Sequence, residues 1–123
     1  MNKVRVTVWG RPFNLSVIYD CYENESIQRG QSEALENFIR ESDVLITALE
    51  PIKKYCLDDE RCNEVSKIDN IFKFVIPTAI FVKRIKKDAE IVLLCDYKFD
   101  LEHGLAIIFK NNRFVGITEQ GAL

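Results

Sequence analysis

The sequence has few of the residues that mark a metal centre, a nucleotide-binding loop or a nucleic-acid-binding surface. Its 123 residues include one histidine and five glycines, and the glycines form neither a phosphate-binding loop nor a dinucleotide fingerprint. Lys and Arg number 17 against 19 Asp and Glu, so no cationic excess is available to neutralise a run of phosphates. We therefore expect no nucleic-acid partner and no bound cofactor.

Long apolar runs are also missing. The longest, such as residues 91–95, fall far short of the roughly 18 residues that a membrane-spanning helix needs. The first residues run directly into a strand-like pattern, without the apolar stretch and small-residue cleavage site of a signal peptide. We therefore expect no membrane partner and a cytoplasmic protein.

The four cysteines do not have the spacing of a metal site. Cys56 and Cys62 do not form a two-residue metal knuckle, and the single histidine, His103, lies far away in sequence. A chain of this length can build its core without disulfides, and a reducing compartment keeps thiols free. We therefore expect no metal and four reduced cysteines: Cys21, Cys56, Cys62 and Cys95.

The composition is that of a globular protein. Hydrophobic residues make up 47% and charged residues 29% of the chain, which is too apolar for a disordered protein. Because no linker, repeat or low-complexity tract interrupts it, we predict a single domain over residues 1–123.

The N-terminal residues alternate between apolar and polar types. Val4, Val6 and Val8 begin one alternating run, and after Gly10 a second run extends through residue 19. This pattern is typical of a β-hairpin. Trp9 continues the alternation, so we expect its side chain on the face opposite the valines, where it packs in the core rather than anchoring a partner.

From Gln31 onwards the period is helical. Ser26 is able to cap a helix that follows it. Apolar residues at helical spacing predict an amphipathic helix that covers a sheet: Leu35, Phe38, Ile39, Leu45, Ile46 and Leu49. Pro51 suits the first turn of a second, short helix through Ile52 and Tyr55.

The C-terminal half has the pattern of several strands. We interpret residues 71–76, which end at Pro77, as a connecting segment that fills the core. Strands are predicted over residues 79–84, 90–97, 104–110 and 113–118, and Asn111-Asn112 suits a tight hairpin with positive φ. Residues 91–95 and 105–109 indicate strands buried on both faces. We predict an α+β fold, an antiparallel sheet of five or six strands (ββ-α-α-ββββ) with the helices packed on one face.

The most conspicuous polar cluster is formed by Asp96, Asp100, Glu102 and His103. Two carboxylates near a histidine can act as acid and base, or can begin a metal site. A turn whose acidic side chains face water explains the same residues, and no nucleophile or oxyanion donor stands nearby. We favour the turn and expect a protein that is not an enzyme. A hydrolase-like enzyme that uses this cluster is the alternative.

Residues 70–77 and 95–109, with Glu102-His103-Gly104 leading into an apolar strand, resemble a bacterial family of small uncharacterised domains. Such domains recur beside polymorphic toxins and contact-dependent growth inhibition loci. The likeness covers most of the C-terminal half, and the first hairpin with Gln31 more loosely. It implies an immunity protein, a toxin inhibitor that binds and neutralises one cognate toxin domain, often a nuclease. It implies no catalytic residue.

An inhibitor of this kind needs complementary charge and shape. A nuclease toxin has a basic substrate cleft, and opposite charges speed encounter and sharpen specificity. We therefore expect toxin contacts near the acidic turn or on the acidic helix face, from Glu33, Glu36, Asp43, Asp96, Asp100, Glu102 and His103. A homodimer that buries the apolar sheet face is a third interpretation.

Overall fold

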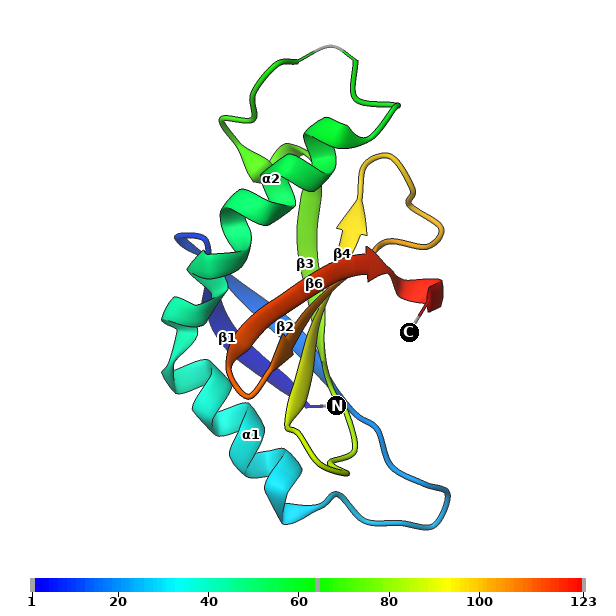
Figure 1. Ribbon diagram of the computed structural model, residues 1–123. Helices are drawn as coiled ribbons and strands as arrows, with labels where there is room; N and C mark the ends of the chain where they lie inside the picture. The colour runs from blue at the N-terminus through cyan, green and yellow to red at the C-terminus, as the bar shows by residue number, and fades with distance from the viewer. Residues whose placement is uncertain (1, 64, 123) are drawn as a thin grey trace.

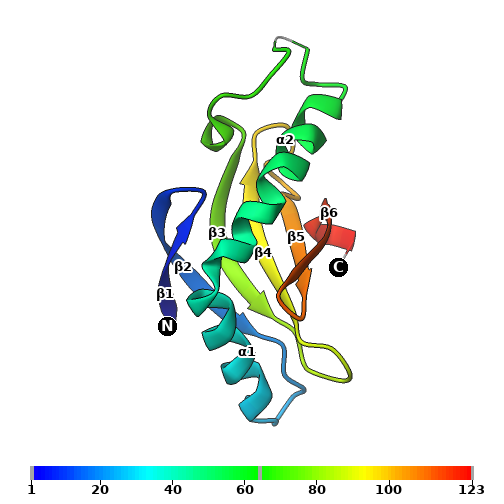
Figure 2. The same cartoon turned by 60° about the vertical axis from the view of Figure 1, so that its left-hand side comes forward.

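A six-stranded sheet with two helices against one face forms the protein (Figures 1 and 2). The computed structural model describes residues 2–63 and 65–122. The strands lie side by side in sequence order: β1 (Lys3–Val8), β2 (Arg11–Tyr19), β3 (Val75–Val82), β4 (Glu90–Tyr97), β5 (Leu105–Lys110) and β6 (Arg113–Glu119). The predicted α+β fold and the order ββ-α-α-ββββ are thereby confirmed.

One pair of strands departs from the antiparallel pattern. All neighbours are antiparallel except β2 and β3, which run parallel. A parallel pair needs a long crossover, because the chain must return to the end at which it started. The crossover contains α1 (Arg29–Arg40), the 3-10 helix η1 (Ser42–Ala48) and α2 (Leu49–Asp58). The sheet is therefore mixed, although mostly antiparallel.

The helical segment differs from its prediction in two respects: the residue that caps its N-terminus and the set of side chains that face the core. α1 is preceded by Gln28 as N-cap, not by Ser26, and Oε1 of Gln31 accepts a bond from the backbone N of Gln28 at 2.9 Å. After Arg40 the chain continues as η1, which has about three residues per turn instead of 3.6. The tighter turn shifts the apolar phase, so Ile46, expected in the core, is 61% exposed.

The strand β3 starts earlier than the sequence indicated. A short 3-10 helix, η2 (Ile71–Lys73), is followed by β3 from Val75, so the segment read as a connector already contains strand. β3 runs through Pro77 because β2 pairs only from Ala79 onwards. Pro77 lacks an N–H group, and no β2 backbone lies opposite it to require one.

The sheet has a closed face, on which α1 and α2 lie, and an open face on the other side (Figure 2). On β4 the alternate residues Ile91, Leu93 and Cys95 belong to the core beneath the helices, where Phe38 packs edge-on to the ring of Phe109 at 5.2 Å. Between them Val92 is also fully buried, so the middle of β4 is buried on both faces as predicted.

Two tight turns have positive φ. Asn111 and Asn112 have φ of 50° and 61°, which confirms the predicted hairpin. Trp9 has φ of 51°, and this turns its ring back onto the core beside the valines, so its predicted place on the opposite face is wrong. Its Nε1 donates to the carbonyl of Leu45 at 2.9 Å. No helix among the described residues is long and apolar enough to cross a membrane.

The phase of the helices can be tested by a pair of alanine substitutions. Phe38 is fully buried, so Phe38→Ala should lower the free energy of unfolding by about 3–5 kcal/mol. Ile46→Ala, at an exposed position of η1, should change it by less than about 0.5 kcal/mol. Urea unfolding measures both values. Equal losses would show that the assigned phase is wrong.

Candidate functional site

The structure divides the seven predicted contact residues between two places. Asp96 lies near the end of β4 and is exposed, and Asp100, Glu102 and His103 follow in the chain that leads to β5. The other three, on the helical side of the molecule, are exposed in α1 and η1: Glu33, Glu36 and Asp43. We call residues 96–104 the acidic turn. In Figure 1 this turn bends to the side of the sheet away from α1 and α2.

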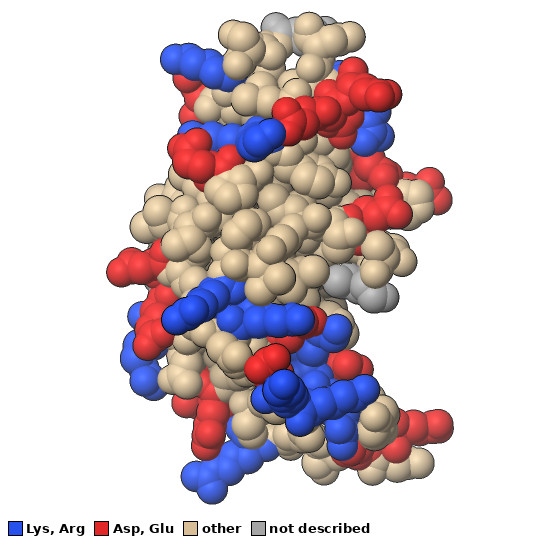
Figure 3. Space-filling model, viewed as in Figure 1, with Lys and Arg blue, Asp and Glu red and all other residues tan. Residues whose placement is uncertain are grey.

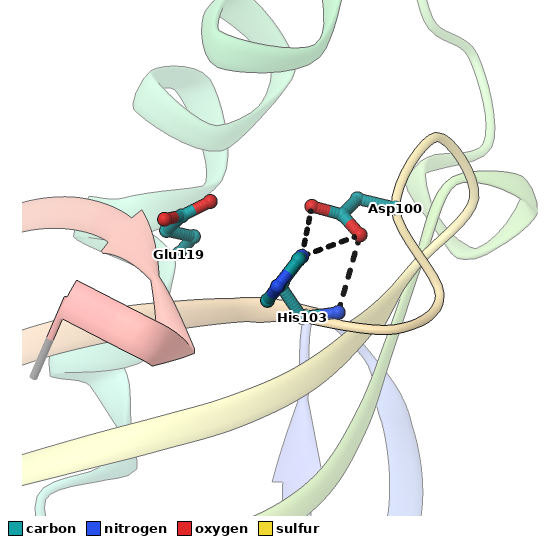
Figure 4. A group of neighbouring side chains, drawn as sticks. All are labelled: Asp100, His103 and Glu119. Carbon is teal, nitrogen blue, oxygen red and sulfur yellow. Dashed lines mark hydrogen bonds and ion pairs between the residues drawn. The ribbon is translucent and has the colours of Figure 1, made fainter.

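Asp100 organises the acidic turn from within (Figure 4). Its Oδ1 accepts a bond from the backbone N of His103 at 3.1 Å, and both of its carboxylate oxygens lie 3.1 Å from Nδ1 of the His103 ring. Its carbonyl accepts from the backbone N of Gly104 at 2.9 Å. One aspartate thereby fixes the backbone and the imidazole of the turn together.

Gly104 closes the turn in a conformation that a side chain would not tolerate. Its φ is +64°, and a Cβ atom would lie 2.5 Å from the carbonyl oxygen of Cys95. The amide of Gln120 fills the adjoining space, with its Nε2 donating to the carbonyls of Cys95 and Leu105 at 3.1 and 3.3 Å. The glycine of the Glu102-His103-Gly104 motif is therefore explained by the close packing of the turn, without any functional role.

A second set of contacts holds the turn from outside. Asp59, at the end of α2, accepts a bond from the Tyr97 hydroxyl at 2.7 Å and pairs with Arg61 at 2.8 Å. Arg61 also donates from Nη1 to the carbonyl of Phe99. No sequence pattern connects Asp59 and Arg61 with the turn, because residues 58–61 have the composition of a solvated loop. Nothing local in the sequence marks this link.

The pKa shifts in and around the turn follow from these bonds. The backbone N–H of His103 and then its ring lower the pKa of Asp100, and the bond to the Asp100 carboxylate raises the pKa of His103. The hydrogen bond from Arg61 holds the pKa of Asp59 well below its usual range. Burial, followed by the bond to Asp59, raises the pKa of Tyr97. The turn therefore favours a charged Asp100 and a protonated His103.

Glu119, at the end of β6, joins Asp100 and His103 as a third group that could ligate a metal (Figure 4). One ligand atom from each lies within 4.8 Å of the others. The Asp100 carboxylate is already engaged by the His103 backbone and ring, and the other two side chains are exposed. The arrangement serves the turn, and we assign it no metal.

Three cavities among the described residues lie away from the Asp100–His103 pair. The largest, of about 430 Å³, is lined mainly by charged side chains of the β3–β4 connection, including Lys83, Lys86 and Lys87. The cavity of about 140 Å³ adjoins the acidic turn itself, because Lys98 and Phe99 line it together with residues such as Arg61 and Cys62, but neither Asp100 nor His103 lines it. The geometry thus places the polar cluster on a rigid, projecting surface rather than inside a cavity.

The fold and this surface define a small α+β domain that presents a braced acidic turn. The chain matches the model of the family described as Domain of unknown function (DUF6985) over residues 1–122, and it belongs to that family. Searches of the curated proteins and of the solved structures find no match.

The cysteines should differ in reactivity according to burial. Cys56 and Cys95 are buried, and burial raises the pKa of Cys56 to about 12 and raises that of Cys95 as well. Cys21 and Cys62 are partly exposed. Brief alkylation of the unreduced native protein should therefore modify only these two, and unfolding should add the other two. A Cys56–Cys62 disulfide found by mass spectrometry would contradict this.

The Asp100–His103 pair can be followed directly, because His103 is the only histidine. Its pKa, measured by NMR titration, should lie above 6.5, and Asp100→Asn should lower it. Since folding raises this pKa, the stability from the pair is present below about pH 6.5 and is lost as the pH rises through the folded value.

Glu102→Gln is the matched control for that titration. It removes a carboxylate from the same turn, but one that makes a smaller contribution to the His103 pKa than Asp100 does. An equal fall of the pKa in both variants would mean that the general negative charge, and not the hydrogen bond to Asp100, controls His103.

Proposed function

We propose that this chain is an immunity-type protein, which binds a toxin domain in the same cell and blocks it by occlusion. One observation carries the proposal: the acidic turn is held rigid from both sides and presents an exposed apolar tip, Leu101, which is 75% exposed. The resemblance of residues 70–77 and 95–109 to immunity-type domains agrees with it.

Rigidity favours binding by this turn. Asp100 fixes it internally, and Arg61, anchored by Asp59, holds its backbone at Phe99. A loop that is already ordered in the free protein loses less conformational entropy when it docks, so more of the contact energy appears as affinity. An exposed leucine on such a loop is suited to fill a pocket on a partner, whereas in a lone protein it gains nothing from its exposure.

The charge of the turn favours a basic partner. Residues 96–104 contain Asp96, Asp100 and Glu102 against Lys98, which gives a net charge of -2 with His103 neutral and -1 with His103 protonated. Glu119 adds a further carboxylate beside His103. A nuclease must attract phosphates to its cleft, so an acidic projection is complementary to it and steers the encounter.

The acidic helix residues form a separate candidate surface. Glu33 and Glu36 lie on α1, and Glu33 pairs with Arg29 at 3.0 Å. Asp43 is exposed in η1. Because these residues lie on the helical side and the acidic turn bends to the other side, substitutions in one set serve as the control for the other (Figure 1).

The alternative is a hydrolase-like enzyme that uses the Asp100–His103 pair. The 3.1 Å contact between the carboxylate and Nδ1 is the observation that favours it. Such a pair can orient an imidazole as a general base. Asp100 and His103 project from the surface, and neither lines any of the three described cavities. Because active sites usually lie in pockets, this position favours occlusion instead.

Co-expression with the toxin domain encoded beside this gene tests the proposal. The wild-type chain should restore growth and should bind the purified toxin one to one. Asp96→Lys with Glu102→Lys leaves the Asp100 bonds in place, and it should weaken binding at least tenfold and reduce its salt dependence. Glu33→Lys with Glu36→Lys should bind as the wild type does. Circular dichroism checks that both variants fold.

Each alternative result has a defined meaning. If only Glu33→Lys with Glu36→Lys bound more weakly, the toxin contact would lie on α1. Unchanged binding by both variants would show that neither the acidic turn nor the acidic residues of α1 contact the toxin. The wild-type chain could fail to protect the cell and instead turn over a substrate. If Asp100→Asn abolished that turnover, the enzyme interpretation would replace immunity.

A further inference from the structure

The open face of the sheet is apolar in its middle. The strand register places Ile18, Phe81, Val92 and Ile108 in one row across β2 to β5. A second row contains Ala79, Leu94 and Ala106. Ile18 is 46% exposed, and Ile76, farther along β3, is 38% exposed. Both helices pack on the other face, so α1 and α2 do not cover these rows, although Val92 and Ala106 at their centre are already fully buried (Figure 2).

Opposite charges border this apolar area at its two ends. At one end residues 83–90, the β3–β4 connection with the first residue of β4, contain four cations against two carboxylates, a net charge of +2, and Glu25 pairs with one of these cations, Arg84, at 2.9 Å. On the strands beside it, Glu90 pairs with Lys83 at 2.8 Å and with Lys110 at 3.6 Å, and the cavity of about 430 Å³ lies here. At the other end is the acidic turn, residues 96–104, with a net charge of -2.

The two ends are separated by the length of β4. A strand of eight residues spans about 26 Å, so the basic connection and the acidic turn are distinct charged regions rather than one neutralised cluster. Figure 3 shows a broad uncharged area between charged side chains of both signs at the upper end and a group of mainly Lys and Arg side chains, with some Asp and Glu, in the lower half.

We propose that a second copy of this chain covers the open face. A two-fold axis that lies between two facing sheets, perpendicular to the strands, reverses the strand direction of one copy relative to the other. The basic connection of each copy then meets the acidic turn of its partner, twice by symmetry. The apolar rows meet between them, as in two sheets packed face to face.

The size of the face agrees with a specific but modest dimer. The four strands β2 to β5, about 4.8 Å apart and about 26 Å long, offer at most roughly 500 Å² per copy, or about 1,000 Å² in total. This is at the lower limit of specific interfaces, so a dissociation constant on the order of micromolar is expected. An apolar centre bordered by charges has the anatomy of such an interface.

This dimer would regulate the proposed function. Only this regulatory role rests on the proposed function; the dimer itself does not. The acidic turn is used both by the second copy and by the toxin, so the two compete for it. The dimer itself follows from the open face whether or not a toxin is bound.

Sedimentation velocity over a range of concentrations tests the dimer. The wild-type chain should shift from monomer to dimer as its concentration passes the micromolar range. Lys86→Glu with Lys87→Glu makes both ends acidic, and Asp96→Lys with Glu102→Lys makes both ends basic. Each double variant alone should have a dissociation constant at least tenfold higher than that of the wild type. An equimolar mixture of the two should form heterodimers, because both end contacts are then favourable.

Two further variants control for the apolar centre. Leu94→Glu, in the middle of the open face, should abolish dimers, whereas Ile46→Glu, an equally large charge change on the helical side, should not affect them. A wild-type chain that stays monomeric at all concentrations would overturn the inference. So would double variants that dimerise as the wild type does, or that fail to associate when mixed.

The same variants separate this inference from the proposed function. Lys86→Glu with Lys87→Glu leaves the acidic turn intact, so it should bind the toxin at least as tightly as the wild type while remaining monomeric. Dimers that form normally in a chain that gives no protection would reject the immunity proposal alone. Protection by a wild-type chain that never dimerises would reject the dimer alone.

Discussion

The amide of Gln31 fastens the crossover to the sheet, and the arrangement of the two layers depends on that contact. Gln31 is fully buried, and its Nε2 donates to the carbonyls of Asp20 and Val82 at 3.0 and 3.2 Å. These carbonyls stand where the parallel strands β2 and β3 end. Because a buried amide without partners costs about 1–3 kcal/mol, the start of α1 has one favourable position over the sheet. The helices then cover the closed face, and no helix lies on the open face.

Local periodicity accounts for what could be predicted of this fold, and long-range contacts account for what could not. Alternation in β1 and β2, and apolar runs in β4 and β5, predicted strands that the structure contains. The parallel pairing of β2 with β3 has no local signal, since periodicity does not encode strand direction. Local patterns predict that a segment ends at Pro77. The proline is accepted within β3 because β2 pairs only from Ala79 onwards, and no local pattern shows where that pairing begins. The left-handed φ of Trp9 is likewise set by its tertiary contacts.

The candidate site shows the same division. Asp96, Asp100, Glu102 and His103 are close in sequence, and the structure keeps them in one turn. The residues that brace the turn come from distant elements: Asp59 and Arg61 from the end of α2, and Gln120 from beyond β6. Their side chains are of types common on any surface, so only the fold gives them a role. Sequence reasoning therefore found the charge of the site but not the source of its rigidity.

The two associations proposed for the acidic turn should respond differently to salt. The proposed contact with a toxin would use exposed charges beside Leu101, and exposed charges are screened within about 10 Å at 0.1 M ionic strength. The face-to-face dimer would also bury partly exposed apolar side chains such as Ile18 and Leu94, and burial of apolar surface is not screened. If both associations occur, rising ionic strength should weaken toxin binding more than self-association. Because the dimer also depends on protein concentration, the free acidic turn would be most abundant when the chain is dilute.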